Sequence, residues 1–160
     1  GLAGYEALQE GLAVLAEYLS GGLTPGRLRI LAARVVAVGC LTHGADFAET
    51  FGRLRRDHGF AAGTAFDVAF RVYRGGGFTK DAIYLAGLRD LLAYLGLGGD
   101  ILPLYVGKIA ETHLPVLEEL ELRGVLAPMP LVPAFLQEPA ALKRLERVQR
   151  GMSLPEMIHP

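Results

Sequence analysis

Apolar side chains recur at steps of three and four residues along most of this chain, which is the period of an amphipathic α-helix. The first such segment runs from Tyr5 to Leu19 and ends at two glycines. Glycine, proline and capping residues separate the later segments. The pattern predicts helices over residues 5–19, 24–43, 46–58, 64–74, 79–95, 100–109, 114–122 and 139–150. The sequence contains no convincing strand, so we expect an all-α fold, a multi-helix domain.

Several of the predicted helix ends carry recognisable signals. Thr24 followed by Pro25 is typical of an N-cap followed by proline at the first helical position. Thr79 is placed to cap the fifth helix and Asp100 to cap the sixth, where Pro103 is tolerable only in the first turn. Prolines at positions 128, 130 and 133 predict an extended or turned stretch before the last helix. We expect a loose tail after that helix.

Composition indicates that the chain folds as a domain of ordinary size. Hydrophobic residues make up 51% of its 160 residues and charged residues 21%, far from the composition that keeps chains disordered. The formal net charge is -1, so no overall field attracts the chain to nucleic acid or to an anionic membrane. We therefore expect neither as a partner.

Cysteine usage and the longest apolar stretch bear on location. Cys40 is the only cysteine, which excludes an internal disulfide framework and favours the reducing cytoplasm. The apolar stretch from Leu28 to Leu41 is interrupted by Arg29 and Arg34, so we interpret it as a buried helix rather than a membrane span. The start lacks a signal peptide and an initiator methionine, and we expect the chain to begin within a longer protein.

The first predicted helix carries the most informative side chains. At about 100° per residue, Glu6, Glu10 and Glu17 fall on one face, opposite a stripe of leucines. One interpretation is a solvated face, since charged stripes usually face water. The other is a ligand helix, in which a carboxylate on a rigid helix supplies an oxygen ligand to a metal.

The sequence around Glu10 favours the second interpretation, because Gln9-Glu10-Gly11-Leu12 resembles the motif of a family of flavohaemoglobin expression-modulating proteins, a domain of formerly unknown function. That family is related to the microtubule-associated tyrosine carboxypeptidases. The resemblance spans about residues 4–137, which we treat as one helical domain, with 138–160 as a terminal helix and loose tail. It continues through Gly44-Ala45-Asp46-Phe47, Arg71-Val72-Tyr73-Arg74-Gly75, Phe78-Thr79-Lys80-Asp81-Ala82-Ile83-Tyr84-Leu85 and Gly107-Lys108-Ile109.

The resemblance implies the C-terminal part of a zincin-like, zinc-dependent metallopeptidase with carboxypeptidase-like activity. Such a protein carries a His-Glu-x-x-His helix and a later glutamate as the third zinc ligand, and Glu10 matches that glutamate. No His-Glu-x-x-His occurs in these 160 residues, so we expect the chain alone to be inactive and to depend on an upstream part of the same protein. The implied substrate is a peptide or protein C-terminus.

Other potential ligands and nucleophiles have simpler interpretations. His43, Asp46 and Glu49 are close in sequence, but Gly44 separates them and no pair of histidines has the i, i+4 spacing of a metal helix. Cys40 lies on an apolar helix, which favours an inert core thiol over a nucleophile.

The last turn of the fourth predicted helix and the start of the fifth offer candidates for substrate binding. Arg71 and Arg74 are neighbours on one helical face, where cations stabilise a helix C-terminus, and either guanidinium could instead grip a substrate carboxylate. Tyr73 and Tyr84 are candidates to stabilise an oxyanion, although each is also typical of a core tyrosine.

Lys80 and Lys108 follow glycine-containing segments without the spacing of a phosphate-binding loop. We interpret both as salt-bridge or helix-end residues that could also reach a substrate cleft. A competing hypothesis for the whole chain is a noncatalytic helical interaction or regulatory module.

Overall fold

A computed structural model describes residues 1–75, 80–126 and 131–158 of the chain. Within these ranges the secondary structure is helical and no strand occurs, which confirms the all-α prediction. The chain divides into two compact units: residues 1–23 together with 86–160, and residues 24–85. No helix in the described ranges is long and apolar enough to cross a bilayer.

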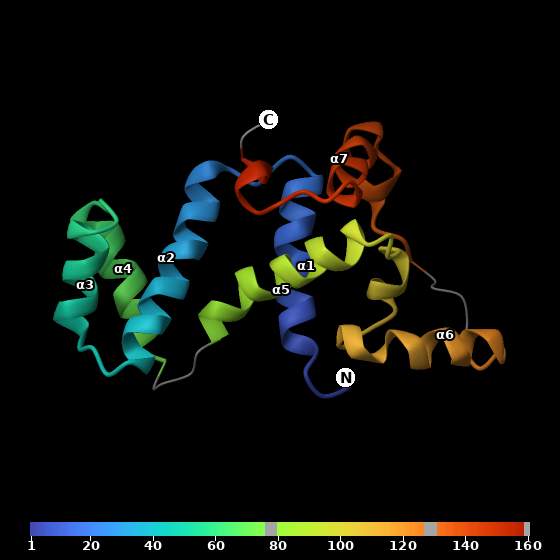
Figure 1. Cartoon of the computed structure of the whole chain (residues 1–160), viewed down its shortest axis with the longest axis horizontal. Helices are drawn as coiled ribbons and strands as arrows, with labels where there is room; N and C mark the ends of the chain where they lie inside the picture. Colours follow the sequence, from blue (N-terminus) through green and yellow to red (C-terminus); the bar gives the residue numbers. More distant parts are fainter. Residues whose placement is uncertain (76–79, 127–130, 159–160) are drawn as a thin grey trace. The chain divides into compact units, whose positions relative to one another are not determined.

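The first unit begins with α1, Tyr5–Leu19, and includes α6, Leu114–Leu122, and α7, Pro139–Gln149 (Figure 1). Gly21, with φ of 82°, ends α1, and the amides of Gly21 and Gly22 bond back to the carbonyls of Tyr18 and Glu17. This is a Schellman ending, which favours glycine at the left-handed position. Arg144 of α7 donates a hydrogen bond to the carbonyl of Leu19, at 2.8 Å, and so joins α7 to the end of α1.

The first unit also contains four short 3-10 helices in its described residues: Leu102–Tyr105, Glu111–His113, Ala134–Gln137 and, after α7, Pro155–Met157. The last of them lies in the predicted tail, where Met157 is buried. Among the prolines of the predicted extended stretch, those at 128 and 130 lie outside the described residues, as does Thr79.

The prediction of a sixth α-helix over residues 100–109 is wrong. This segment forms only the 3-10 helix Leu102–Tyr105, with the side chain of Asp100 accepting a hydrogen bond from the amide of Leu102 at 3.1 Å. Pro103 removes an amide donor, and Gly107 has poor helix propensity, so a longer helix does not form. The remaining α-helices agree with the prediction to within about two residues at each end.

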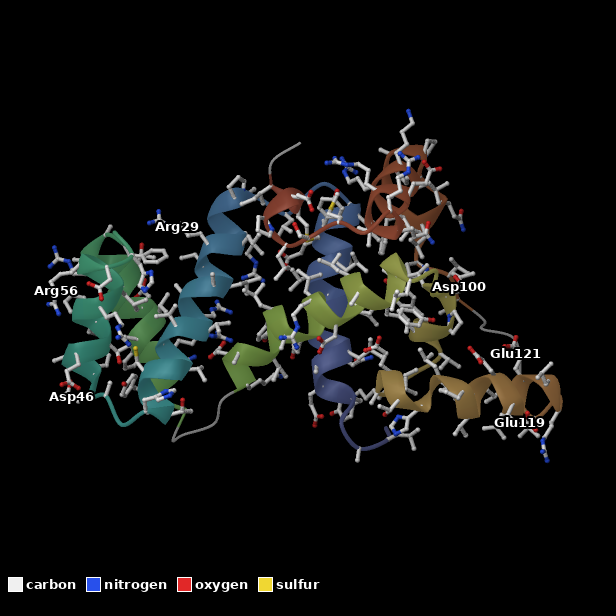
Figure 2. All side chains as sticks on the ribbon, viewed as in Figure 1. Arg29, Asp46, Arg56, Asp100, Glu119 and Glu121 are labelled. Carbon is white, nitrogen blue, oxygen red and sulfur yellow. The ribbon has the colours of Figure 1, made fainter. Side chains whose placement is uncertain are left out.

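The second unit contains α2, Pro25–Thr42, α3, Phe47–Arg56, and α4, Ala62–Tyr73. Thr24 caps α2 as predicted, accepting a hydrogen bond from the amide of Arg27. Asp46 and Glu49 form a capping box at the start of α3, and Arg56 lies at its other end (Figure 2). Helix α5, Lys80–Gly96, contributes its first residues to this unit and its later residues to the first unit.

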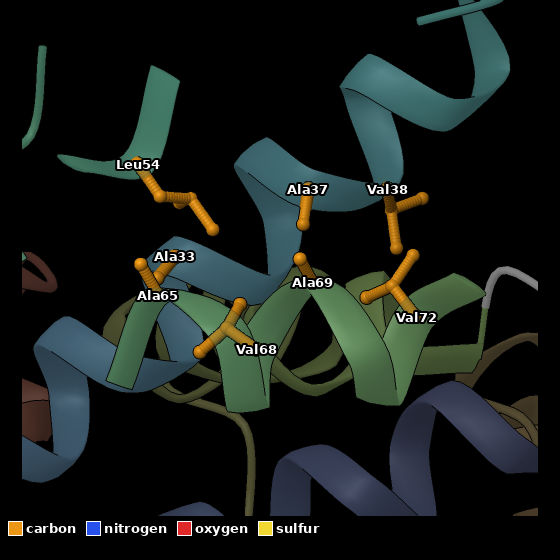
Figure 3. Packing of buried hydrophobic residues seen from close by; sticks show 8 residues of the cluster. All are labelled: Ala33, Ala37, Val38, Leu54, Ala65, Val68, Ala69 and Val72. Atoms are coloured by element: carbon orange, nitrogen blue, oxygen red, sulfur yellow. The ribbon is translucent and has the colours of Figure 1, made fainter. Parts of the chain in front are cut away.

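Small side chains let α2 and α4 pack closely in the second unit. Ala33 and Ala37 of α2 lie against Ala65 and Ala69 of α4, and Leu54 of α3 joins them (Figure 3). All of these side chains are almost completely buried. The core of this unit therefore leaves little room for larger residues.

Candidate functional site

Helix α1 does not present its three carboxylates to solvent in the same way. Glu6 is exposed, whereas Glu10 and Glu17 are half-buried. The opposite side of the helix, including Leu8, Leu12 and further apolar residues, is buried. The first of the two interpretations requires a uniformly solvated face. The face that carries Glu10 is not uniformly solvated.

The glycine next to Glu10 permits a close crossing of two helices in the first unit. A Cβ at Gly11 would lie 2.6 Å from the carbonyl oxygen of Gly87 on α5. A Cβ at Gly87 would lie 2.7 Å from the carbonyl carbon of Ala7 and closer still to its oxygen. Real Cβ atoms do not approach a backbone this closely, so both positions require glycine. The crossing of α1 and α5 (Figure 1) fixes the backbone beside Glu10.

A charged cluster lies in the second unit, where Arg71 of α4 and Arg34 of α2 share one carboxylate. The Nε of Arg71 donates to Asp81 Oδ1 at 2.7 Å, and Nη1 of Arg34 lies 3.6 Å from the same oxygen. The Asp81 side chain is 12% exposed, compared with 15% for Arg34 and 40% for Arg71. The hydrogen bond from Arg71 to Asp81 raises the pKa of the Arg71 guanidinium.

Two members of this cluster were missed by the sequence interpretation. Asp81 belongs to a segment of the resemblance, and Arg34 interrupts the most apolar helix of the chain. A charged residue in such a helix is a signal of a buried ion pair, because a lone buried charge is strongly unfavourable. The identity of its partner depends on tertiary structure.

Arg74 and Tyr84 have looser surroundings. Arg74 follows the end of α4, is exposed, and has its guanidinium carbon 5.7 Å from the ring centroid of Phe70. Tyr84 is half-buried, and the guanidinium carbon of Arg34 lies 6.0 Å from the centroid of its ring. Tyr84 is thus a neighbour of the charged cluster, whereas Arg74 stacks on an exposed aromatic side chain.

The hydroxyl of Tyr73 is committed to hydrogen bonds within the second unit. It donates to the backbone carbonyls of Ala45 and Asp46 just before α3, and it lies 2.7 Å from Thr50 Oγ1. Since its single proton is shared by the carbonyls, the Thr50 hydroxyl acts as the donor in the third contact. These bonds favour a structural role for Tyr73, which ties α4 to the start of α3.

The two candidate lysines lie in different units. Lys80 is the first residue of α5 and is exposed. Lys108 is exposed in the first unit, with its ammonium 5.2 Å from the ring centroid of Tyr5, and its carbonyl accepts a hydrogen bond from the amide of Leu2. The contact with Tyr5 is within the range of a cation–π interaction.

The alternative ligands near Cys40 have local hydrogen-bonding roles. His43 Nδ1 donates to the carbonyl of Gly39 at 2.7 Å, and the carboxylates of Asp46 and Glu49 cap α3. Cys40 is buried, and its Sγ lies 3.5 Å from Nη1 of Arg53. These contacts account for the four residues without a ligand.

A catalytic zinc ion requires three protein ligands and an open position. In the described part of the chain, no group of three or more histidine, cysteine, aspartate or glutamate side chains is arranged to hold a metal ion. The side chains in the described part of the chain therefore do not complete such a site by themselves.

A comparison with protein families decides where this arrangement belongs. The family model described as microtubule-associated tyrosine carboxypeptidase matches residues 1–153. The chain belongs to this family. The match reaches beyond the resemblance over residues 4–137 and includes α7. No significant match is found among curated proteins or among solved structures.

Membership of the tyrosine carboxypeptidase family gives the close helix crossing a context. The crossing glycine, Gly11, directly follows Glu10, within the run that carries the resemblance. The geometry accounts for the glycine by steric exclusion.

Proposed function

We propose that this chain is the helical C-terminal part of a zinc-dependent, carboxypeptidase-like enzyme, with Glu10 as the third metal ligand. The longer protein, called the parent protein below, would supply the His-Glu-x-x-His helix of a zincin-like domain. The reaction suggested by the family description is hydrolysis of the last peptide bond of a protein, which releases a C-terminal tyrosine.

The observation that carries this proposal is the backbone crossing beside Glu10. A metal ligand must be held in a defined geometry, and a carboxylate on a rigid helix meets that need better than one on a loop. The close approach of α1 and α5 at Gly11 and Gly87 prevents α1 from shifting along α5. Glu10 is also half-buried, which supports a role for its carboxylate other than contact with water alone.

Several residues of the chain would bind or orient the metal ion and the substrate. Glu10 would hold one coordination position, and a zinc ion so bound supplies a water molecule whose pKa is lowered. Arg71 or Arg74 would bind the substrate carboxylate, since a guanidinium fork matches it bidentately. Tyr84, and less readily Tyr73, would donate to the developing oxyanion, with Lys80 and Lys108 as further cations near substrate.

Metal analysis of the parent protein tests the assignment of Glu10. Glu10→Gln should lower the zinc content well below one equivalent while far-ultraviolet circular dichroism stays unchanged, because the amide is a poor ligand of the same shape. Glu6→Gln is the matched control on the same helix face, and it should retain full zinc content. Full zinc occupancy in Glu10→Gln would eliminate Glu10 as a ligand.

Activity separates the enzyme from the alternative of a noncatalytic helical module. The parent protein should release tyrosine from a peptide that ends in this residue, and Glu10→Gln should abolish release. The isolated chain should release none, since it carries one of the three protein ligands. A parent protein that binds zinc and yet leaves the peptide intact would favour the noncatalytic module.

A further inference from the structure

Two neighbouring pockets of the first unit differ in their chemistry. One has a volume of about 620 Å³ and a mostly apolar lining that includes Leu92, Met152 and Leu154. The other has a volume of about 760 Å³ and is lined by four carboxylates, those of Asp90, Asp100, Glu111 and Glu118. Ala93 and Leu97 line both pockets. The two pockets therefore form one continuous groove beside the end of α5, with an apolar half and an acidic half.

The acidic half of the groove is only partly neutralised by the first unit. Asp90 pairs with the neighbouring Arg89 at 2.8 Å, and the Asp100 carboxylate accepts a hydrogen bond from the backbone. In the described part of the chain, the side chains of Glu111 and Glu118 form no hydrogen bond or ion pair. Burial, and then the charge of Asp90, raise the pKa of Glu111. A cation placed among these carboxylates would relieve their repulsion.

The arrangement of the four carboxylates indicates which kind of cation fits. Among the described residues, no group of three or more histidine, cysteine, aspartate or glutamate side chains is arranged to hold a metal ion. The carboxylates instead line a pocket of about 760 Å³, which is large enough for several cationic groups. Ammonium and guanidinium groups carried along a peptide can each reach a separate carboxylate. The acidic half therefore suits a basic peptide segment better than a single metal ion.

Leu97, directly after α5, indicates that the same segment also carries apolar side chains. It is 90% exposed although it lines both halves of the groove. Scattered exposed leucines are common, and Leu122 of α6, 84% exposed, is one that lines neither half. Leu97 differs because it shares a pocket with Leu92, Met152 and Leu154. An apolar side chain entering this pocket would bury Leu97 together with its neighbours.

We propose that the groove binds a basic, amphipathic segment of a partner protein. The cationic side chains of the segment pair with the acidic half, and its apolar side chains pack on the apolar half. Charge complementarity selects this occupant, because nucleic acids and anionic membrane surfaces carry the same sign of charge as the acidic half. Glu10 is not among the lining residues, and the interaction requires neither zinc nor turnover.

Peptide binding to the full-length parent protein tests the groove. The probe is a short fluorescent peptide in which lysines precede leucines, and its affinity is measured by anisotropy. Two control peptides carry glutamate in place of lysine, or serine in place of leucine. The parent should bind the probe, and it should bind either control peptide at least about 10-fold more weakly, because each control peptide matches only one half of the groove.

A pair of matched double variants tests the acidic half. Glu111→Gln combined with Glu118→Gln removes carboxylates from the groove and should weaken binding of the probe about 10-fold. Glu119→Gln combined with Glu121→Gln removes the same charge from α6 outside the groove (Figure 2) and should leave the affinity nearly unchanged. Sodium chloride should weaken binding to the parent more than binding to the first double variant, because salt screens charge pairs that this variant has already lost.

A second matched pair tests the apolar half. Leu97→Ser should weaken binding of the probe about 10-fold or more, since this leucine becomes buried only in the complex. Leu122→Ser removes a leucine of similar exposure outside the groove and should leave the affinity unchanged. Both variants should keep the thermal stability of the parent, because both side chains are exposed.

Three outcomes would overturn the inference. Equal weakening by the two double variants, or full affinity in Leu97→Ser, would mean that the probe follows negative charge in general. A parent that self-associates in sedimentation experiments, and loses this association in Leu97→Ser, would show that the groove receives a second copy of the protein. A parent that does not bind the probe, and whose thermal stability falls in Leu97→Ser, would show that the parent covers the groove with a segment of its own.

Discussion

The two units bring their helices together by different physical means. In the first unit, α1 and α5 approach so closely at Gly11 and Gly87 that a side chain at either position would collide with the other helix's backbone. In the second unit, alanines line the packing of α2 and α4, and a buried carboxylate, Asp81, links arginines from both helices. Steric fit is insensitive to pH and salt, whereas a charged link depends on both. The comparison thus predicts different vulnerabilities for the two units.

The largest effect is expected at the backbone crossing. Gly87→Ala places a methyl group against the carbonyl of Ala7, which is backbone and cannot move aside. We expect a loss of about 3 kcal/mol or more in the free energy of unfolding, at the upper end of the cost of overpacking. Urea unfolding followed by circular dichroism measures it.

The control for this prediction is Gly39→Ala on α2, where a Cβ meets nothing within 4 Å. It should be neutral or stabilise by up to about 1 kcal/mol, because alanine has the better helix propensity. Equal stability of the Gly87→Ala and Gly39→Ala variants would show that the crossing of α1 and α5 is looser than described.

The charged link of the second unit should produce the next largest effect. Asp81→Asn leaves Arg34 and Arg71 close together without a carboxylate, and we expect a loss of about 2–4 kcal/mol, as for other buried pairs that lose one partner. Asp67→Asn removes an exposed carboxylate from α4 and should change stability by less than about 0.5 kcal/mol. If thermal denaturation shows the same midpoint for both variants, the link does not stabilise this unit.

A smaller loss of stability is expected when a neutral hydrogen-bonding group of the second unit is removed. Tyr73→Phe removes a hydroxyl that bonds to two carbonyls and to Thr50, so we expect a loss of about 1–2 kcal/mol. Tyr84→Phe retains the ring that faces Arg34 and should cost less than about 0.5 kcal/mol. Chemical denaturation of both variants provides the comparison, and a larger loss for Tyr84→Phe would reverse our assignment of structural roles.

The smallest expected effect concerns Glu111 in the first unit. Unlike the groups above, its carboxylate lowers the stability of the folded chain. Burial, and then the charge of Asp90, raise the pKa of Glu111. Because the folded-state pKa lies above the unfolded-state value, the ionised carboxylate destabilises the folded chain at neutral pH, and this penalty disappears as pH falls below the unfolded pKa.

Glu111→Gln should therefore stabilise the chain by at most about 0.5 kcal/mol at pH 7, and the gain should vanish near pH 4. Denaturation at a series of pH values measures this trend. Glu121→Gln removes an exposed carboxylate of α6 and should show no gain. A gain from Glu111→Gln that grows as pH falls would contradict the direction of the pKa shift.

The sequence by itself determined most of the helices, because their signals are local. Thr24 and Pro25 mark the start of α2, and the apolar period of α1 marks its buried face. The failure at residues 100–109 shows the limit of such signals, since an apolar period does not compensate for Pro103 and Gly107. The resemblance around Glu10 pointed to a family related to the tyrosine carboxypeptidases, and the comparison confirmed the relation to the tyrosine carboxypeptidases.

Tertiary structure alone decided which residues meet across helices. Gly11 and Gly87 are 76 positions apart, and neither indicates its partner in the sequence. Arg34, Arg71 and Asp81 lie on three different helices, so their shared carboxylate becomes visible only when those helices pack. Helix periods and caps depend on neighbours within a few residues, whereas steric exclusion and buried charge depend on distances in space, which the local pattern of a chain does not contain.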